Sequence, residues 1–196
     1  MTTPVQFLDR IGILDQDTLL VHTIWVDDDD IETIAKRRAK ISHNPESNMK
    51  LASGIAPVAD FIKAGICVGL GTDGCASNNN LDLFSEMDMA AKIHKVNAFD
   101  TTVMDARTVL NMATIGGAKA IGIDKDIGSI EVGKQADLII IDIDKPHLVP
   151  MYNPASHIVY SVRGSDVRDV LVAGRILTKD HKLLSIDLSE ILDKVS

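Results

Sequence analysis

The sequence predicts an α/β protein with a parallel sheet, followed by a segment rich in β-structure. Three short apolar runs in the first half are each followed by a stretch with helical spacing, which is the pattern of consecutive βα units. The runs are apolar throughout, as expected of strands whose two faces are both covered. After about residue 123 the pattern changes to one of turns and strands.

The first βα unit begins with Thr18–Trp25, an apolar run rich in β-branched residues that predicts a strand. Four aspartates, Asp27–Asp30, follow it. They predict the start of a helix, because an aspartate caps the first turn well and negative charge there interacts favourably with the helix dipole. A metal site is the alternative, and it is disfavoured because four consecutive side chains do not converge easily on one ion.

The second unit has a short strand at Lys40–Asn44 and a polar loop at Pro45–Asn48. A helix is expected to start near Pro57 and to end at Gly65. The apolar residues between these two positions, Phe61 among them, have the spacing of one helical face.

The third unit has a strand at Ile66–Leu70, a loop that contains Asp73, and a helix over Leu81–Lys95. Three βα units in series predict a parallel sheet with right-handed crossovers. The sheet is either doubly wound or closed into a barrel, and the spacing alone does not choose between them.

The rest of the chain begins with a helix from about Ala106 to Ala120, weakened at Gly116–Gly117. We place a domain boundary at residues 123–128, where the composition changes. Strands are expected at Leu138–Ile143, Ile158–Val162 and Val167–Ala173, the last continuing through Gly174–Arg175 into Ile176–Leu177, and an amphipathic helix at Asp187–Val195.

The composition argues against several classes of partner. There are 28 Asp and Glu residues against 20 Lys and Arg, for a net charge of −8, which disfavours nucleic-acid binding. The two cysteines, Cys67 and Cys75, are too few and too differently placed for a disulfide framework, which favours a cytoplasmic location. The chain shows no secretory signal and no apolar stretch that could span a bilayer, so a membrane partner is not expected.

Asp73 is the most informative residue, because the segment Gly69–Gly74 places it at the exit of a buried strand. An ionised carboxylate there must be paired, hydrogen-bonded or bound to a metal, since burying it alone is costly. The same segment matches the dinucleotide-binding pattern G-x-G-x-x-G. That interpretation is disfavoured, because the loop Cys75–Asn80 precedes the next helix and the aspartate would repel a pyrophosphate.

Four ordered blocks of sequence point to one family. They are Val21-His22; Ser42-His43-Asn44-Pro45-x-Ser47-Asn48-x-Lys50-Leu51 with Gly54-Ile55-Ala56-Pro57-Val58; Gly71-Thr72-Asp73-Gly74 with Ser77-Asn78-Asn79; and Gly128-x-Ile130-x-x-Gly133-x-x-Ala136-Asp137-Leu138. Together they resemble the amidohydrolase superfamily, and within it the cytosine-deaminase-like branch. That branch contains the 5′-methylthioadenosine/S-adenosylhomocysteine deaminases, to which the blocks are most similar, and the triazine chlorohydrolases.

The resemblance implies a (β/α)8 TIM barrel with a β-sandwich assembled from both chain ends. It assigns the three expected strands to the sixth, seventh and eighth of that barrel. The fold class is then α/β, a partial TIM barrel followed by part of a small β-sandwich. Residues 1–123 would be the C-terminal part of a metal-dependent hydrolase barrel, 124–186 the β-sandwich portion and 187–196 a terminal helix.

The resemblance also implies a divalent metal at the C-terminal mouth of the barrel, zinc first and iron as the alternative. Asp73 matches the family's metal-ligand aspartate, which also takes the proton from the attacking water; a loop-capping role is the alternative. His22 matches the catalytic histidine that polarises the substrate or the tetrahedral intermediate. The alternative for His22 is an ordinary core histidine.

Four polar residues match the mouth loop and are candidates for substrate binding: His43, Asn44, Ser47 and Asn48. They either contact a purine-like ring or hold the loop in shape through bonds to the backbone, and the sequence leaves both interpretations open. Glu86 and His94 are expected to be ordinary helix residues.

The metal-ligand set in this chain is expected to be incomplete. No His-x-His pair occurs in the sequence and no histidine precedes His22, whereas the family motif has such a pair on its first strand. A single carboxylate falls short of the three protein ligands typical of catalytic zinc. We interpret the 196 residues as the C-terminal portion of a longer enzyme or as half of a split one, inactive alone.

The function implied by the resemblance is hydrolytic deamination of an adenine-type nucleoside, of the methylthioadenosine/adenosylhomocysteine class, by metal-bound hydroxide. The expected partners are a purine-nucleoside-like substrate and the missing N-terminal half or a partner chain, with a homo-oligomer as a further candidate. The alternatives are a non-catalytic subunit or interaction module of a split amidohydrolase, and a chlorohydrolase or other C–N hydrolase of the family.

Overall fold

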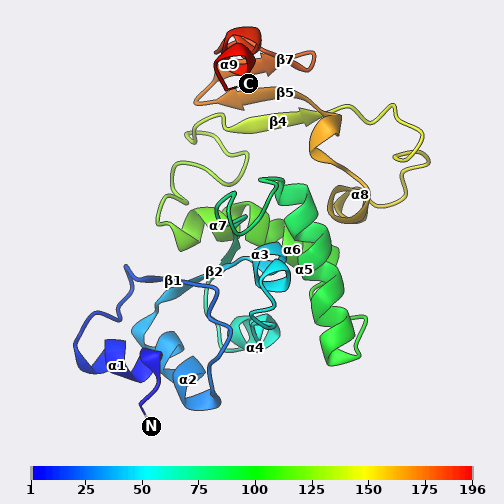
Figure 1. Cartoon of the computed structure of the whole chain (residues 1–196). Coiled ribbons are helices and arrows are strands. Elements are labelled where there is room, and N and C mark those ends of the chain that lie inside the picture. The colour runs from blue at the N-terminus through cyan, green and yellow to red at the C-terminus, as the bar shows by residue number, and fades with distance from the viewer. Residues whose placement is uncertain (1, 196) are drawn as a thin grey trace.

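The computed structural model describes residues 2–195 and contains two separate sheets (Figure 1). The first is a parallel sheet of three strands in the order β1-β2-β3, and the second is a sheet of four strands in the order β4-β5-β6-β7. The strands are β1 (Leu19–Val21), β2 (Lys40–His43), β3 (Val68–Leu70), β4 (Leu138–Ile141), β5 (Val167–Val172), β6 (Arg175–Lys179) and β7 (Lys182–Leu183). The helices are α1 (Pro4–Arg10), α2 (Asp28–Arg37), α3 (Pro45–Lys50), α4 (Val58–Lys63), α5 (Leu83–Ala98), α6 (Ala106–Ala113), α7 (Ile115–Ala120), α8 (Pro154–Tyr160) and α9 (Leu188–Val195), with a 3-10 turn η1 (Gly164–Asp166).

The parallel sheet is built from consecutive βα units, as the spacing predicts. Leu20 pairs with Ile41, and Ile41 pairs in turn with Val68, so the three strands run side by side in chain order. Helix α4 packs against α2 and β3, and α7 packs against β2 and β3. The expectation of an α/β protein with parallel strands is therefore confirmed.

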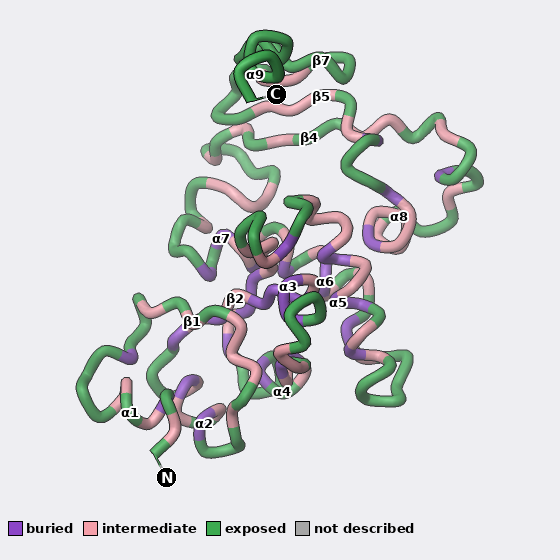
Figure 2. The backbone as a smooth tube through the Cα atoms, in the orientation of Figure 1, coloured by how far each residue is buried: buried purple, intermediate pink, exposed green. Residues whose placement is uncertain are grey.

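The core lies between this sheet and its helices. The side chains of Ile34, Ile41, Val58, Phe61 and Val109 have no exposed surface. Burying a side chain of this size stabilises a fold by about 1.5–3 kcal/mol. Buried residues gather around β2, α3, α5 and α6, so the best-packed part of the chain surrounds the ends of the parallel strands (Figure 2).

The second sheet is antiparallel and less buried. Ile139 and Ile176, on β4 and β6, are about half exposed. Helix α8 precedes β5 in the chain but packs against α5 and α6. The position of the second sheet at the C-terminal end of the molecule is visible in Figure 1.

Strand β1 is shorter than the apolar run Thr18–Trp25 predicts. It ends at Val21, because His22 and Thr23 adopt left-handed backbone conformations with φ of 67° and 46°. A strand cannot continue through two such residues. Trp25 is then 82% exposed, on the connection to α2.

Two local predictions are wrong because helix start signals, a proline in both cases and a side-chain cap in the second, were overlooked. Residues Pro45–Asn48, expected as a loop, belong to α3, which has proline at its first position. Residues Ile158–Val162, expected as a strand, lie mostly in α8: Pro154 is its first residue and the Asn153 side chain accepts a hydrogen bond from the Ser156 amide at 3.1 Å. These start signals outweigh the β-preference of the isoleucine and valine.

Further differences concern the limits and number of elements: the strand expected over Leu138–Ile143 ends at Ile141, and β7 was not predicted. The helix expected over 106–120 is divided into α6 and α7 at Thr114 (φ −124°, ψ −105°), just before the two glycines. Helix α1 was not predicted, although Thr3 and Gln6 form a reciprocal capping box at its start. Within residues 2–195 none of the helices has the length and apolar character needed to cross a membrane.

Candidate active site

The carboxyl ends of the three parallel strands place three loops at one edge of the sheet. Beyond the paired strand residues, the His22 amide donates to the Ser42 carbonyl at 3.0 Å and the Gly71 amide donates to the His43 carbonyl at 3.0 Å. These bonds extend the ladder by one residue on each side of β2. The chain segments that leave β1 and β3 are therefore held level with each other, with helix α3 between them.

Gly71 allows this close approach. A Cβ atom at Gly71 would lie 2.8 Å from Nδ2 of Asn44 and 2.9 Å from Oγ of Ser42. Both atoms belong to short side chains at the end of β2, and Ser42 donates to the Asn44 amide oxygen at 3.2 Å. A side chain at position 71 would force these two side chains to move, so this close packing favours glycine.

Asp73 lies two residues beyond Gly71, in a left-handed conformation with φ of 60°. Its Oδ2 accepts a hydrogen bond from the Ser47 hydroxyl at 2.7 Å, and its Oδ1 accepts one from the Gly74 amide at 2.7 Å. These hydrogen bonds, that of Ser47 first, lower the pKa of Asp73 to about 2. The carboxylate is therefore ionised at neutral pH and keeps lone pairs free for a cation or a donor.

His22 lies beside Asp73. Its Nε2 is 3.6 Å from Oδ2 of Asp73, and its Nδ1 donates a hydrogen bond to Oδ1 of Asn48 at 2.8 Å. With Nδ1 protonated, the neutral ring has the lone pair of Nε2 on the side of the carboxylate. Ser47 and Asn48 are neighbours on α3, so one short helix contacts both residues.

The structure separates the four candidate substrate-binding residues into two groups. Ser47 and Asn48 contact Asp73 and His22 directly. Asn44 packs against Gly71. The His43 ring contacts His94 of α5, with 3.0 Å between their Nε2 atoms. All four have 3% or less of their surface exposed. Contact with a substrate by these residues stays a prediction.

Two functional candidates on α5 were missed. Glu86 is fully buried and His94 is 4% exposed, so neither is a solvent-facing helix residue, and both become candidates for a role in the site. Burial raises the pKa of Glu86 to about 7 and lowers the pKa of His94 to about 4; burial, with the neighbouring imidazoles, lowers the pKa of His43 to about 3. Their spacing with the buried Ala90, at i, i+4 and i+8 of one helical face, was the signal available in the sequence.

The residues present do not form a complete metal centre. Within residues 2–195 no group of three or more histidine, cysteine, aspartate and glutamate side chains is placed to hold a metal ion. Asp73 supplies one ionised carboxylate with His22 next to it, whereas a catalytic zinc site needs three protein ligands. Any further ligands would have to come from outside this part of the chain.

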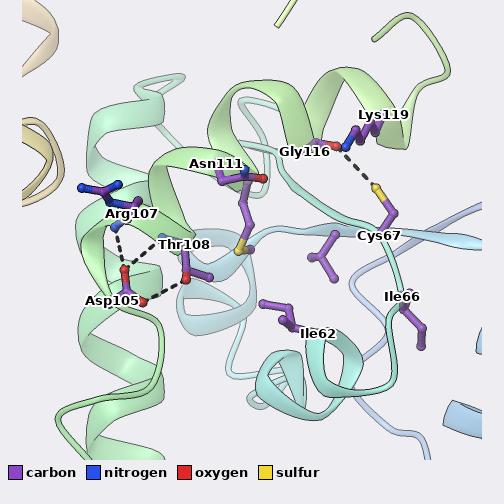
Figure 3. Close-up of a pocket in the computed structure, with 11 residues that line it drawn as sticks. Ile62, Ile66, Cys67, Asp105, Arg107, Thr108, Asn111, Gly116 and Lys119 are labelled. Carbon is purple, nitrogen blue, oxygen red and sulfur yellow. Dashed lines mark hydrogen bonds between the residues drawn. The ribbon is translucent and has the colours of Figure 1, made fainter. Parts of the chain in front are cut away.

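A cavity of about 460 Å³ lies elsewhere, near the start of β3 (Figure 3). Ile66, Cys67 and Val68 line it, together with residues of α4, α6 and α7. The loop of Asp73 follows the opposite end of the same strand. This cavity is therefore separate from the site formed by His22 and Asp73.

The segment that follows β3 also bears on the dinucleotide-binding alternative. The next helix after Gly74 is α5, which begins only at Leu83. No helix N-terminus of the described chain therefore opens directly after the glycines, and the carboxylate of Asp73 lies where a phosphate would need positive charge. The geometry does not support that alternative.

Comparison with known proteins establishes the family. The model of the amidohydrolase family matches residues 1–177, so the chain belongs to this family and the resemblance drawn from the four sequence blocks is confirmed. A 5-methylthioadenosine/S-adenosylhomocysteine deaminase of Syntrophobacter fumaroxidans is 52% identical over 192 residues, which are 98% of this chain and 44% of that protein. A 5′-deoxyadenosine deaminase of Methanosarcina barkeri is 51% identical over 189 residues, 96% of this chain and 43% of that protein. The chain thus spans less than half the length of these curated relatives.

Solved structures agree with this assignment. An adenosine deaminase from Xanthomonas campestris with bound zinc superposes with a TM-score of 0.95 at 40% identity, over 97% of this chain and 44% of that one. The atrazine chlorohydrolase TrzN from Arthrobacter aurescens, complexed with zinc, superposes with a TM-score of 0.92 at 28% identity, over 98% of this chain and 43% of that one. The amidohydrolase fold therefore extends over nearly the whole chain.

Proposed function

We propose that this chain is the C-terminal portion of a metal-dependent amidohydrolase that deaminates an adenine-type nucleoside. The observation that supports this most strongly is the juxtaposition of His22 and Asp73 at the ends of β1 and β3, with Ser47 and Asn48 of one helix bonded to them. The similarity to the deaminases of S. fumaroxidans and M. barkeri supports the reaction class. The lower identity to the chlorohydrolase makes dechlorination the weaker alternative.

The proposed architecture is a partial (β/α)8 barrel in which β1, β2 and β3 are the last three strands. In the described chain β1 pairs with β2 alone and β3 pairs with β2 alone, so both outer strands have an edge that a further strand could pair with. Residues 1–123 would belong to the barrel, 124–186 to a β-sandwich and 187–196 to a terminal helix. Residues 1 and 196 lie outside the described part of the chain. This boundary separates the two sheets, although α8 packs against the first unit.

Asp73 is proposed to carry a fixed negative charge toward a metal and to accept a proton from the attacking water. Because its pKa is about 2, it is a weak base toward ordinary water and accepts a proton effectively only from an acidified one. A divalent metal, zinc or iron, would supply that Lewis acidity when its remaining ligands are contributed from outside this chain. Ser47 holds the Asp73 carboxylate in one orientation.

His22 is proposed to hold or move a proton on the substrate side of the site. Its bond to Asn48 fixes the ring and keeps the proton on Nδ1, which leaves Nε2 to accept or donate near the reacting atoms. The 3.6 Å separation from Asp73 keeps the two groups close without a direct hydrogen bond. Both groups can therefore contact a single ligand atom that lies beside them.

The test combines this chain with the N-terminal portion of the enzyme, in one polypeptide or by coexpression, and measures ammonia release. The substrates are 5′-deoxyadenosine, methylthioadenosine and S-adenosylhomocysteine. Asp73→Asn and His22→Ala should each lower kcat by about 10²–10⁴-fold. The matched control is Asp60→Asn, at an exposed aspartate of α4, which should leave kcat unchanged.

Near-normal turnover by Asp73→Asn would contradict the proposed role. Absence of ammonia release by the wild-type assembly on all three nucleosides would instead favour a non-catalytic subunit, the second candidate. That candidate is kept because the described residues lack a complete ligand set of their own.

A further inference from the structure

Helix α5 directs two buried ionisable side chains toward the site. Glu86 and His94 are eight residues apart, roughly two turns, and so lie on one face of the helix. A buried carboxyl group is costly unless polar partners satisfy it. Glu86 has one partner 40 residues away, Glu46, and one eight residues away, Asn78, so its role is more than local.

The two oxygens of Glu86 join two different segments. Oε2 accepts a hydrogen bond from the backbone amide of Glu46 at 3.1 Å, and Oε1 accepts one from Nδ2 of Asn78 at 2.7 Å. Glu46 is the second residue of α3, and the N-cap residue of that helix, Asn44, makes no side-chain capping bond. Glu86 therefore satisfies an amide at the start of α3 that has no partner within the helix.

Asn78 extends this connection to both sides of Asp73. Its Nδ2 also donates to the carbonyl of Thr72 at 3.0 Å, and its backbone amide donates to the carbonyl of Gly74 at 2.8 Å. Thr72 and Gly74 are the residues directly before and after Asp73. Because Asn78 is 4% exposed, water has little access to compete for these bonds.

We infer that Glu86 is a positioning residue for the proposed reaction, holding helix α3 and the loop of Asp73 to α5 through its two oxygens. Helix α3 carries Ser47, which bonds to Asp73, and Asn48, which bonds to His22. Loss of the Glu86 contacts would therefore displace both groups of the site together. The inference rests on the proposed function, because it assigns Glu86 to the same reaction.

The neighbourhood of Glu86 explains why a neutral replacement is informative. A second carboxylate, that of Glu46, accepts hydrogen bonds from the Ser85 hydroxyl and from Nδ2 of Asn78, the latter at 3.3 Å. Glutamine at position 86 preserves volume and removes the repulsion with Glu46. It also replaces one of the two accepting oxygens by an NH2 donor, which then faces the Glu46 amide or Nδ2 of Asn78 and cannot accept its hydrogen bond. Glu86→Gln therefore tests the two-segment contact without leaving a cavity.

The first measurement is steady-state kinetics on the chain combined with its N-terminal portion, with 5′-deoxyadenosine as substrate. Glu86→Gln should lower kcat by about 10- to 100-fold, the range that follows from misplacing a reacting group by about 1 Å. Asn78→Ala should have a similar effect. The double variant should lose little more than either single variant, because both act through the same contact. The control is Glu32→Gln, at an exposed position of α2, with unchanged kcat.

The second measurement is amide hydrogen exchange on this chain, which does not depend on activity. In Glu86→Gln, exchange at residues 45–50 and 72–78 should accelerate by about tenfold or more, while α4 exchanges as in the wild type. Wild-type kcat in both single variants, or strictly additive losses in the double variant, would overturn the inference. Equal acceleration across α4 as well would show a general loss of stability and would also overturn it. If the wild-type assembly releases no ammonia, the proposed function fails, and the exchange data alone decide whether Glu86 holds the two segments.

Discussion

Replacing His94 by glutamine should remove much of the sensitivity to acid that the buried imidazole pair gives this fold. The Nε2 atoms of His43 and His94 are 3.0 Å apart, so one proton is shared between two neutral rings. The Nδ1 atom of His43 is buried and has no hydrogen-bond partner in the described part of the chain. A further proton on this pair, beyond the one that each neutral ring carries, would place a buried charge without an acceptor.

The sign of the effect follows from the pKa values. Burial lowers the pKa of His43 to about 3 and that of His94 to about 4, from 6.5 in the unfolded chain. Below pH 6.5 the unfolded chain takes up protons that the folded chain refuses. The stability contributed by the neutral pair is therefore fully present above pH 6.5 and is lost as the pH falls from 6.5 toward the folded pKa values.

Glu86 has the opposite effect on stability over much of the same pH range. Its pKa is raised from 4.5 to about 7, so between these values the folded chain holds a proton that the unfolded chain releases. Each proton contributes a slope of about 1.4 kcal/mol per pH unit. The two histidines lower the free energy of unfolding as the pH falls, and the glutamate raises it. Together they lower it by about 1.4 kcal/mol per pH unit between pH 6.5 and 4.5. Asp73, with a pKa of about 2, changes stability only at lower pH.

His94→Gln should reduce this net slope nearly to zero. At pH 7 the variant should be about 1 kcal/mol less stable, because the bond between the rings is lost. By pH 5 the wild type should have lost about 2 kcal/mol of unfolding free energy through His43, His94 and Glu86 together. At that pH the variant should therefore be as stable as the wild type or more stable.

The assay is urea unfolding followed by circular dichroism at pH 7, 6 and 5. The control is His181→Gln, at an exposed turn beside β7. A difference in unfolding free energy between His94→Gln and wild type that stays constant from pH 7 to 5 would refute the argument. So would an equal change in slope for the control.

Two further predictions concern packing and capping. Gly69→Ala should destabilise the chain by about 1–3 kcal/mol in urea unfolding, because the new Cβ would lie 2.9 Å from the backbone Cα of Gly117; Gly74→Ala, which meets no atom within 4 Å, is the control, and equal effects of both would contradict the reasoning. Asn153→Ala should cost about 0.5–2 kcal/mol, because the α8 cap bond to the Ser156 amide is lost, and an unchanged unfolding midpoint would count against that cap.

Several features of the site could be predicted from short stretches of sequence. An apolar run that ends in Gly71 and Asp73 indicates a strand followed by a polar residue at its exit. His22 lies inside the predicted strand Thr18–Trp25, and only the family resemblance placed it at a strand exit. Parallel strands in βα units have their carboxyl ends at one edge, so the two residues are expected to meet there. The structure brings them to within 3.6 Å.

Other features could not be predicted, because they depend on contacts between distant residues. Ser47 and Asp73 are 26 positions apart, Glu46 and Glu86 are 40 apart, and His43 and His94 are 51 apart. Nothing in the local pattern around Glu86 states that its carboxylate reaches helix α3. The same holds for the contact that satisfies the Glu46 amide at the start of helix α3, which comes from α5.

By itself, the sequence determined the α/β class of the fold, the parallel direction of the first strands and the position of Asp73 after a strand, because apolar spacing, glycine placement and helix capping act over a few positions. Only the tertiary structure decided which polar groups are buried and what satisfies them. Burial depends on how α5 packs over α3 and the loop of Asp73, and a buried polar group is stable only where packing supplies its partner. For this reason Asp73 could be singled out from its place after a strand and His22 from the family resemblance. The spacing on α5 could indicate only that Glu86 is buried, and its partners could be recognised only once the helices were in place.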